Sequence, residues 1–491
     1  MVELVDEYEH SEYEAEKQLI KEVYKDQKQQ NQALQQLEEY YKPYIKINKL
    51  SQEIELGIRK EFDIIQACET IIQHQPLNYD KSGNWWAWYD DEKTWKLIDE
   101  IDILTSMKDS IKNINEILKN NIYTQFFRSL KVVSRGLKLK ELNKDWIQFK
   151  NKIINYNTGE ELTPSGEYFL TNCIPHNIRE CTQTPTIDKL ITEWVGTENI
   201  ETVYDVFAYL LLRDYPIQRI IVFLGSGSNG KGSFLRLMRR LLGLNNCCST
   251  DLDKLNQNRF ETAGLYKKLL CEIAETNITS LRHTSTLKRL TGGDLISAEF
   301  KGKNSFQFEN YAKLIVASNS LPMTMDKTDG FYRRWLILDF NNKFNDGKEI
   351  IEDVGEEELE CLCYKLLKRL PNLLQSRKFS NEGDVNKRRV KYEEKSNPLK
   401  TFVDKFYVRD LDGVVTKWEF NEMFKDFLTQ RGYRYLTNHE INSGLSGLGL
   451  VVKKKTLDGK TWQVIEGIRR FNPDLVKKEQ RKVDDVELVG L

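Results

Sequence analysis

A short apolar strand, Ile220–Leu224, runs directly into a glycine-rich loop at residues 225–231. Residues 234–242, which follow the loop, have apolar side chains at helical spacing. The loop has the pattern G-x-x-x-x-G-K, in which glycines let successive backbone N–H groups turn inward around a phosphate. The start of the following helix adds the positive end of its dipole. A strand, such a loop and a helix in this order predict a phosphate-binding loop in an α/β fold.

The predicted loop supplies ten residues for binding a nucleotide. Lys231 is expected to reach the terminal phosphate. Gly232 stands where a Ser or Thr is usual, so Ser233, one residue later, is the candidate Mg²⁺ ligand. A purely structural glycine-rich turn is the alternative, and the flanking strand and helix favour binding. The ten residues are Gly225, Ser226, Gly227, Ser228, Asn229, Gly230, Lys231, Gly232, Ser233 and Phe234.

Two further apolar strands, expected at 268–274 and 313–318, end in polar residues. Glu275 directly follows the first strand, and Glu272 within that strand is a second candidate. Nucleotide hydrolysis needs such a carboxylate to hold the water shell of the metal and to polarise the attacking water. The second ends at Asn319, whose amide can sense a γ-phosphate because ligands bind at the carboxyl ends of strands in open α/β sheets. The alternation of strands and helices from about 196 to 375 is typical of a parallel sheet covered by helices.

Paired arginines, Arg333 and Arg334, precede the expected strand at 335–338. So close to a nucleotide site, such a pair suggests an arginine finger offered to a neighbouring subunit. In isolation, an arginine pair is more often surface charge.

Taken in order, these residues resemble superfamily 3 helicases, above all the helicase half of the phage/plasmid and poxvirus-type primase-helicases. The pattern is G-x-G-x-N-G-K, then K-L-L-x-x-x-x-E, then L-K-R-L-T-G-G-D at 287–294, then Asn319 with Pro322, then the paired arginines. The string at 287–294 is its most specific element. The resemblance is strong over 196–345 and weak over 80–195.

The resemblance implies a hexameric AAA+ ring that hydrolyses ATP with Mg²⁺ at subunit interfaces and threads one DNA strand through its pore. Lys231 and Ser233 would bind phosphates and Mg²⁺, Glu275 would be the main acidic residue and a metal ligand, and Asn319 would be the sensor. Arg333 or Arg334 would be the finger. No acidic metal set or zinc ribbon precedes residue 196, so primase activity is not expected.

Family members also project a β-hairpin into the pore, which here would span 296–308. Its tip would contain Phe300, Lys301, Gly302, Lys303 and Asn304. Two lysines around a turn glycine suit a phosphate backbone, and Phe300 can pack on a sugar or base.

The segment from Pro398 to Pro473 is expected to fold as helix, strand, helix, helix and hairpin, an order that resembles a winged helix. Thr437 or Asn438 could cap a helix that runs to Gly447. On that helix Asn438, His439, Asn442 and Ser443 are candidate readers of base edges. Lys453, Lys454 and Lys455 would grip phosphates from the hairpin.

Another aromatic-rich segment, 85–98, contains Trp85, Trp86, Trp88 and Trp95 around a turn at 90–93. It predicts a hairpin. Aromatic side chains can stack on bases, but no basic residues alternate with these, so a place in the core is favoured.

The predicted domains are an acidic helical extension at 1–75, a mixed α/β domain at 76–195, the ATPase at 196–375, a charged linker at 376–397, the winged helix at 398–475 and a tail at 476–491.

Composition restricts the location and the partners of the chain. Lys and Arg number 73 against 74 Asp and Glu, which excludes a polybasic binder. No apolar run approaches 18 residues, and the acidic N-terminus is not a secretory signal, so neither a membrane nor secretion is expected. The eight cysteines form no C-x-x-C pair, and most of them are expected to be small buried hydrophobes. The protein is expected in the cytoplasm of a bacterial host.

Together these observations predict a replicative DNA helicase and origin-binding replication initiator of a phage or phage-related mobile element. Its partners would be single-stranded DNA, double-stranded origin DNA, five further copies of itself and host replication proteins. Two alternatives stay open: a DNA-binding regulator switched by ATP without translocation, and a viral-type RNA or packaging ATPase on the same core.

Overall fold

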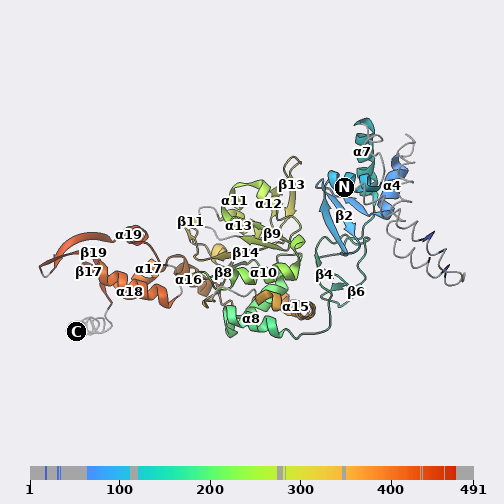
Figure 1. The fold of residues 1–491 in the computed structure, drawn as a ribbon. Helices are drawn as coiled ribbons and strands as arrows, with labels where there is room; N and C mark the ends of the chain where they lie inside the picture. Colours follow the sequence, from blue (N-terminus) through green and yellow to red (C-terminus); the bar gives the residue numbers. More distant parts are fainter. Residues whose placement is uncertain are drawn as a thin grey trace, which may run out of the picture. The chain divides into compact units, whose positions relative to one another are not determined.

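A computed structural model describes residues 64–110, 120–273, 280–281, 284–344, 350–431, 433, 435–457 and 459–471, and the isolated positions 17, 18, 21, 30, 31 and 34. The chain divides into two compact units (Figure 1). The first comprises residues 1–141 with 165–169, and the second comprises the remainder. The boundary at Glu141 therefore falls inside the predicted domain at 76–195. Most of the predicted acidic extension and all of the predicted tail lie outside the described residues.

The first unit contains a three-stranded antiparallel sheet in the order β1-β2-β3. The hairpin predicted at 85–98 is confirmed, because Trp88 lies opposite Trp95 across β2 and β3. Its tryptophans are core residues, at most 5% exposed. The elements are α4 (Ile64–His74), β1 (Leu77–Tyr79), β2 (Trp85–Tyr89), β3 (Thr94–Ile98), α5 (Glu100–Ser110) and α7 (Asn120–Gly136).

The second unit is built on a five-stranded parallel sheet in the order β16-β8-β14-β10-β9. Both faces are covered, which explains the continuous apolar runs of its strands. Ile221 and Phe223 of β8 pack with α9, α10 and α15, whereas Val222 and Leu224 pack with α13 and α14. The predicted alternation of strands and helices is confirmed. The strands are β8 (Ile220–Leu224), β9 (Cys247–Thr250), β10 (Leu270–Ile273), β14 (Lys313–Ser318) and β16 (Trp335–Asp339).

Helices, short strands and a hairpin surround this sheet. The helical elements are α8 (Pro185–Val195), η1 (Thr197–Asn199), α9 (Ile200–Leu210), α10 (Lys231–Leu242), η2 (Leu244–Asn246), α11 (Leu252–Gln257), α12 (Arg259–Ala263), α13 (Ser285–Leu290), α14 (Asp329–Tyr332), η3 (Ile350–Asp353) and α15 (Glu356–Ser376). The additional strands are β4 (Trp146–Phe149), β5 (Ile153–Asn155), β6 (Glu161–Leu162), β7 (Cys173–Ile174), β11 (Ser280–Leu281), β12 (Leu295–Ala298), β13 (Phe306–Glu309) and β15 (Met323–Thr324). None of the helices in the described ranges has the length and apolarity that crossing a bilayer requires.

The segment predicted as a charged linker, 376–397, is mainly a packed helix, α16 (Val385–Ser396). Asp384 caps its start by accepting from the Lys387 N–H. Tyr392 is fully buried against Trp335, with the ring centroids 4.9 Å apart. The charge run therefore belongs to a helix that packs on the sheet, and the prediction of a linker is corrected for residues 385–396.

The C-terminal part has the predicted order of helix, strand, helix, helix and hairpin. Asn397 ends α16, and its side chain also caps the next helix by accepting from the Lys400 N–H. Thr437 forms a capping box with Glu440, which decides between the two predicted caps. The sheet order is β17-β19-β18. The elements are α17 (Pro398–Phe406), β17 (Tyr407–Thr416), α18 (Lys417–Gln430), α19 (Asn438–Gly447), β18 (Val451–Leu457) and β19 (Lys460–Arg470).

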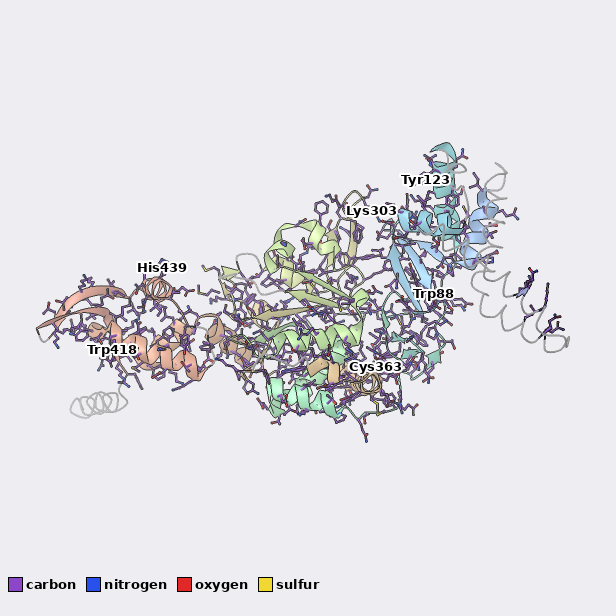
Figure 2. The ribbon with its side chains drawn as sticks, viewed as in Figure 1. Trp88, Tyr123, Lys303, Cys363, Trp418 and His439 are labelled. Carbon is purple, nitrogen blue, oxygen red and sulfur yellow. A yellow bond between two sulfur atoms is a disulfide. The ribbon has the colours of Figure 1, made fainter. Side chains whose placement is uncertain are left out.

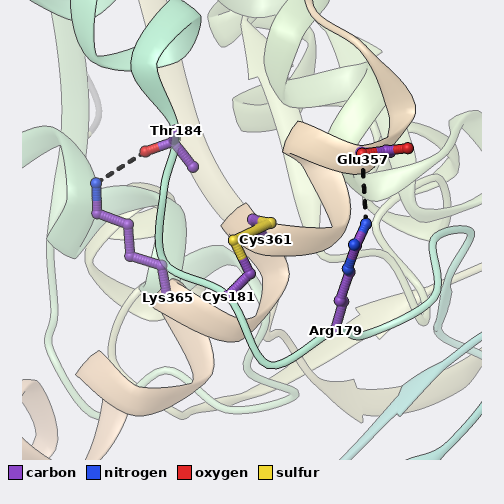
Figure 3. Close-up of a disulfide and its surroundings, with 6 residues drawn as sticks. All are labelled: Arg179, Cys181, Thr184, Glu357, Cys361 and Lys365. Carbon is purple, nitrogen blue, oxygen red and sulfur yellow. Dashed lines mark hydrogen bonds and ion pairs between the residues drawn. A yellow bond between two sulfur atoms is a disulfide. The ribbon is translucent and has the colours of Figure 1, made fainter.

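Two of the cysteines, Cys181 and Cys361, are joined by a disulfide between the segment before α8 and helix α15 (Figure 3). An ion pair between Arg179 and Glu357 and a hydrogen bond from Lys365 to Thr184 flank it. The expectation that most of the cysteines are small buried hydrophobes does not extend to this pair. The two residues are 180 positions apart, so their pairing leaves no pattern in the sequence.

Candidate nucleotide and DNA-binding sites

The glycine-rich loop joins the carboxyl end of β8 to the start of α10, in the middle of the parallel sheet. Three of its residues have left-handed backbone conformations: Gly227 (φ 101°), Ser228 (φ 46°) and Gly230 (φ 85°). Left-handed residues in a turn direct successive backbone N–H groups to one side, which makes a concavity for an anion. The loop thus has the backbone shape that a phosphate requires.

Close contacts explain why positions 225 and 230 of the loop are glycine, but not why position 232 is. A Cβ at Gly225 would lie 1.8 Å from Asn229 Nδ2, and a Cβ at Gly230 would lie 2.4 Å from Cδ1 of Trp194. Either substitution would force the loop to move. Gly232 has open space around its Cβ position, so nothing in the packing prevents a larger residue there.

Lys231 lies at the centre of this site. Its Nζ donates to Gly225 O (2.6 Å), to Asn229 Oδ1 (3.0 Å) and to Asn319 Oδ1 (3.0 Å). Asn319 directly follows β14, the neighbour of β8, so the ends of two adjacent strands meet at one ammonium group. The Lys231 ammonium group is therefore surrounded by protein oxygens. Phosphate oxygens of a bound nucleotide could replace some of these as hydrogen-bond acceptors.

Asn229 holds the loop in place. It is 3% exposed, and its Nδ2 donates to Phe340 O (3.0 Å), just beyond β16. The Phe344 N–H donates to Ser228 O (2.8 Å) from the same segment. The loop pattern predicts a phosphate-binding role for Asn229 but not this supporting role, and it gives no sign of Trp194, Phe340 or Phe344. These contacts join segments more than 30 residues apart in the chain, so no local pattern reveals them.

The two acidic candidates for the nucleotide site are Glu275 and Glu272. Glu275 lies outside the described residues. Glu272 is 7% exposed and pairs with Arg239 of α10, at 2.7 Å between Oε2 and Nη1. Its buried Oε1 has no hydrogen-bond partner among the residues that the structure describes. Burial raises the pKa of Glu272, and Arg239 acts against this shift. Glu272 lies opposite Ile315 of β14, which in turn lies opposite Ile221 of β8. Ile221 is three residues before the end of β8, so Glu272 lies roughly 10 Å along the strand direction from the start of the loop.

Ser233, the candidate Mg²⁺ ligand, lies in the first turn of α10. Its Oγ accepts from Arg236 Nη2 (3.1 Å). A guanidinium at this distance repels a divalent cation. The Ser233 hydroxyl therefore does not fit a magnesium ligand in this arrangement.

Arg333 and Arg334 lie at the amino end of β16, on the opposite end of the sheet from the loop. Arg334 is 8% exposed and donates to Thr291 Oγ1 (2.9 Å), to Gly330 O and to Gln218 Oε1 (3.2 Å). It therefore holds the start of the T-G-G-D turn in its own subunit. Arg333 is exposed, and its Nη2 donates to the same Gln218 Oε1 (3.0 Å). The strand between these arginines and the loop is five residues, roughly 16 Å.

The predicted hairpin is formed by β12 and β13, and its lysines are at an exposed turn (Figure 2). Lys301 and Lys303 are exposed, Gly302 has φ 79°, and the Lys303 N–H donates to Phe300 O (2.9 Å). Phe300 is half-buried and stacks on Phe306, with the ring centroids 5.2 Å apart. Phe300 therefore supports the hairpin, and Lys303 Nζ lies over its ring, 5.7 Å from the centroid.

In the C-terminal part, α19 carries Asn438, His439, Asn442 and Ser443, all exposed (Figure 2 shows His439). Asn442 Oδ1 accepts from Nζ of the largely buried Lys417 (2.6 Å), so one of its two reading atoms is already occupied. On β18, Lys453 pairs with Glu466 (3.0 Å). Lys454 and Lys455 are exposed beside it.

Comparisons with known proteins place similarities on both halves of the chain. Residues 65–196 match a family described as D5 N terminal like, and residues 223–334 match a family of unknown function, DUF5906. The putative helicase L207/L206 of Acanthamoeba polyphaga mimivirus is 25% identical over 213 residues, which is 38% of this chain and 22% of that protein. The chain thus spans less than a quarter of that relative.

Solved structures of the NrS-1 C-terminal region in its apo state have low similarity. One is 13% identical with a TM-score of 0.46, covering 83% of this chain and 100% of that chain. Another is 12% identical with a TM-score of 0.43, covering 82% and 98%.

Proposed function

We propose that this chain is an ATP-hydrolysing DNA helicase that acts in replication. The observation that carries the proposal is the position of Lys231 Nζ, within hydrogen-bond distance of Gly225 O, Asn229 Oδ1 and Asn319 Oδ1. A lysine ammonium group at a left-handed loop, with a polar amide from the next strand, is an arrangement suited to holding a terminal phosphate and responding to its loss. The similarity to a putative helicase and to the D5 N terminal like family supports the same direction.

ATP would supply the phosphoryl group whose transfer to water releases the free energy. The chain's own residues would bind and orient it. The loop N–H groups would hold the phosphates, Lys231 would move from protein oxygens to the terminal phosphate, and the Asn319 amide would be released from Lys231 to face that phosphate.

We further propose that the protein works as a ring of the AAA+ type, with six copies expected. The sheet order β16-β8-β14-β10-β9 places the loop between central strands, and the exposed Arg333 lies at the other end of the sheet from its own loop. An arginine so placed cannot reach the phosphate in its own subunit, but it can serve a neighbour's site. Lys301 and Lys303 would contact single-stranded DNA, and the C-terminal module, proposed as a winged helix, would bind duplex DNA at an origin.

The test uses purified full-length protein with ATP, Mg²⁺ and either a forked DNA or the same fork in RNA. We expect DNA-stimulated ATP hydrolysis and unwinding of the DNA fork only. Lys231→Ala should reduce turnover by about 10²–10³-fold with an unchanged melting temperature. Lys254→Ala is the matched control, because this lysine is exposed and pairs with the nearby Asp251.

Each alternative has its own signature in this experiment. ATP-dependent DNA binding without unwinding would replace the helicase by a switched regulator. Preference for the RNA fork would replace it by an RNA motor. Wild-type turnover in Lys231→Ala would remove the nucleotide site itself.

A further inference from the structure

The hairpin of β18 and β19 extends beyond the three-stranded sheet of the C-terminal module (Figure 1). Strand β17 pairs with β19 between Val464 and Arg470, whereas β18 pairs with β19 as far as Lys460, at the turn of the hairpin. Residues 454–457 and 460–463 therefore form a two-stranded ribbon, here named the wing ribbon.

One face of the wing ribbon carries an exposed tryptophan between two lysines. Trp462 lies directly opposite Lys455, and the side chains of opposed residues project to the same face of an antiparallel pair. Lys460 is two positions before Trp462 on β19, so it projects to that face as well, roughly 7 Å along the strand. Trp462 is 39% exposed, and both lysines are exposed. The indole ring is therefore accessible and has a cationic side chain on two sides.

The charge of the wing ribbon is positive. Residues 454–463 contain three lysines and one acid, Asp458 in the turn, which lies outside the described residues. The two carboxylates described on neighbouring parts of this sheet are paired elsewhere, Glu466 with Lys453 (3.0 Å) and Asp410 with Arg469 (3.0 Å). The lysines beside Trp462 are thus not neutralised by these acids.

Helix α19, the expected reader of base edges, lacks such cations. Its sequence contains no Lys or Arg, and Glu440 lies in its first turn as part of the capping box. Asn442 Oδ1 already accepts from Lys417. A helix without a cation and with a carboxylate near its start has little attraction for a phosphate backbone. The wing ribbon supplies the positive charge that α19 lacks.

A second exposed tryptophan in the same module has different surroundings. Trp418 of α18 is 68% exposed and is followed by Glu419 and Glu422 on the same helix. Lys417, which precedes it, is buried and engaged with Asn442. Of these two tryptophans, Trp462 is the one that lies between exposed lysines.

We propose that the wing ribbon binds single-stranded DNA, with the Trp462 ring stacked on a base and Lys455 and Lys460 on the flanking phosphates. Aromatic rings that stack on bases, beside cations that follow the backbone, are the means by which proteins hold single strands of any sequence. In a duplex each base is already stacked on its neighbours, so an inserted ring must first separate a base step. The inference extends the proposed DNA binding of the C-terminal module from duplex to single strand and does not involve ATP hydrolysis.

The first experiment measures the binding of fluorescently labelled oligo(dT) to the full-length protein by anisotropy, without nucleotide. All variants carry Lys301→Ala and Lys303→Ala, so that the hairpin of β12 and β13 does not contribute. Trp462→Ala should weaken binding about fivefold or more, the lower end of what one base–aromatic stack contributes. Trp418→Ala, the matched control, should leave the affinity unchanged.

Replacing Lys455 and Lys460 with Ala should make the salt dependence of this binding less steep by about 1.4, at roughly 0.7 per phosphate contact. Lys425→Ala, an exposed lysine of α18, should leave the slope unchanged. An undiminished affinity in Trp462→Ala would overturn the proposal. A loss confined to a duplex competitor would overturn it too, because the wing ribbon would then be a duplex contact.

Photochemical crosslinking locates the contact without any change at the wing ribbon. Oligo(dT) with one 5-iododeoxyuridine should crosslink to the tryptic peptide 461–469, which contains Trp462. Crosslinks that map only to other peptides would contradict the proposal, even if Trp462→Ala fails to fold. DNA-stimulated ATP hydrolysis, measured separately, reports on the proposed helicase function, so a failure of either idea is distinguished from a failure of the other.

Discussion

Lys231 Nζ donates to Asn319 Oδ1 over 3.0 Å, which joins the loop after β8 to the residue after β14. Both strands are central in the parallel sheet, and their carboxyl ends meet at this bond. A terminal phosphate would compete with the Asn319 oxygen for the same ammonium group. The bond is therefore the contact that nucleotide binding is expected to break.

The first prediction follows from that competition. Asn319→Ala should leave ATP binding within a few-fold of the wild-type affinity, because Lys231 keeps Gly225 O and Asn229 Oδ1 as partners. Turnover should fall by about 10²-fold, the usual cost of one polar group that orients the transition state. Nucleotide affinity and single-turnover hydrolysis measure the two effects. Asn245→Ala, an exposed asparagine after α10, is the control, and equal loss of binding and turnover would contradict this role.

The arginine pair should separate into two phenotypes. Arg333→Ala should abolish ATP hydrolysis without lowering the melting temperature, because its side chain is exposed. Mixing it with Lys231→Ala subunits should restore part of the activity, since some interfaces then contain an intact loop and an intact arginine. Arg334→Ala should instead lower the melting temperature, because the buried guanidinium holds Thr291 and Gln218. Absence of any recovery at all mixing ratios would argue against a finger in trans.

The two acidic residues should differ in kind. Glu275→Gln should bind ATP and hydrolyse it poorly, whereas Glu272→Gln should keep its turnover, because Glu272 is engaged with Arg239 about three residues below the loop. Loss of turnover in Glu272→Gln alone would reverse the two roles.

Glu272 also gives a pH prediction. Its pKa is raised in the folded state, mainly by burial, so folding favours the protonated form. The stabilisation is complete below the unfolded pKa and is lost as the pH rises through the folded pKa. Glu272→Gln should flatten the dependence of the melting temperature on pH above about pH 4. Parallel profiles for the wild type and the variant would contradict this assignment.

The hairpin lysines should act on DNA alone. Replacing Lys301 and Lys303 with Ala should preserve basal ATP hydrolysis but remove its stimulation by DNA and the unwinding of a fork. The salt dependence of single-strand binding should become less steep by about 1.4, at roughly 0.7 per phosphate contact. The control replaces Lys254 and Lys378, two exposed lysines elsewhere. Unchanged unwinding would show that DNA passes by another route.

The parts of the fold that sequence predicts well are those that neighbouring residues determine together. Each strand of the parallel sheet is a short apolar run, and β8 is followed at once by the glycines that turn its chain. The capped helix α19 and the hairpin of β18 and β19 are local in the same sense. Patterns of this kind are visible because burial, backbone preference and turn chemistry act within a few residues.

The rest depends on partners far away in the chain. The charge run at 385–396 looks like a linker until Tyr392 is seen against Trp335. Arg333 and Arg334 are equivalent in sequence, and only the fold buries the second against Thr291. Asn442 appears free to read a base until Lys417 is found at its carbonyl. In each case a tertiary contact decides the role of a side chain, and neighbouring residues carry no trace of it.

The junction at Asn397 has a mechanical consequence. Asn397 ends α16 and caps the start of α17, so the two helices are separated by this one residue. A single residue provides only one pair of backbone dihedrals to absorb a turn. Helix α16 is also joined to β16, because Lys391 Nζ donates to Ile337 O (2.8 Å). The C-terminal module is thus connected to the sheet through two consecutive helices that have only Asn397 between them.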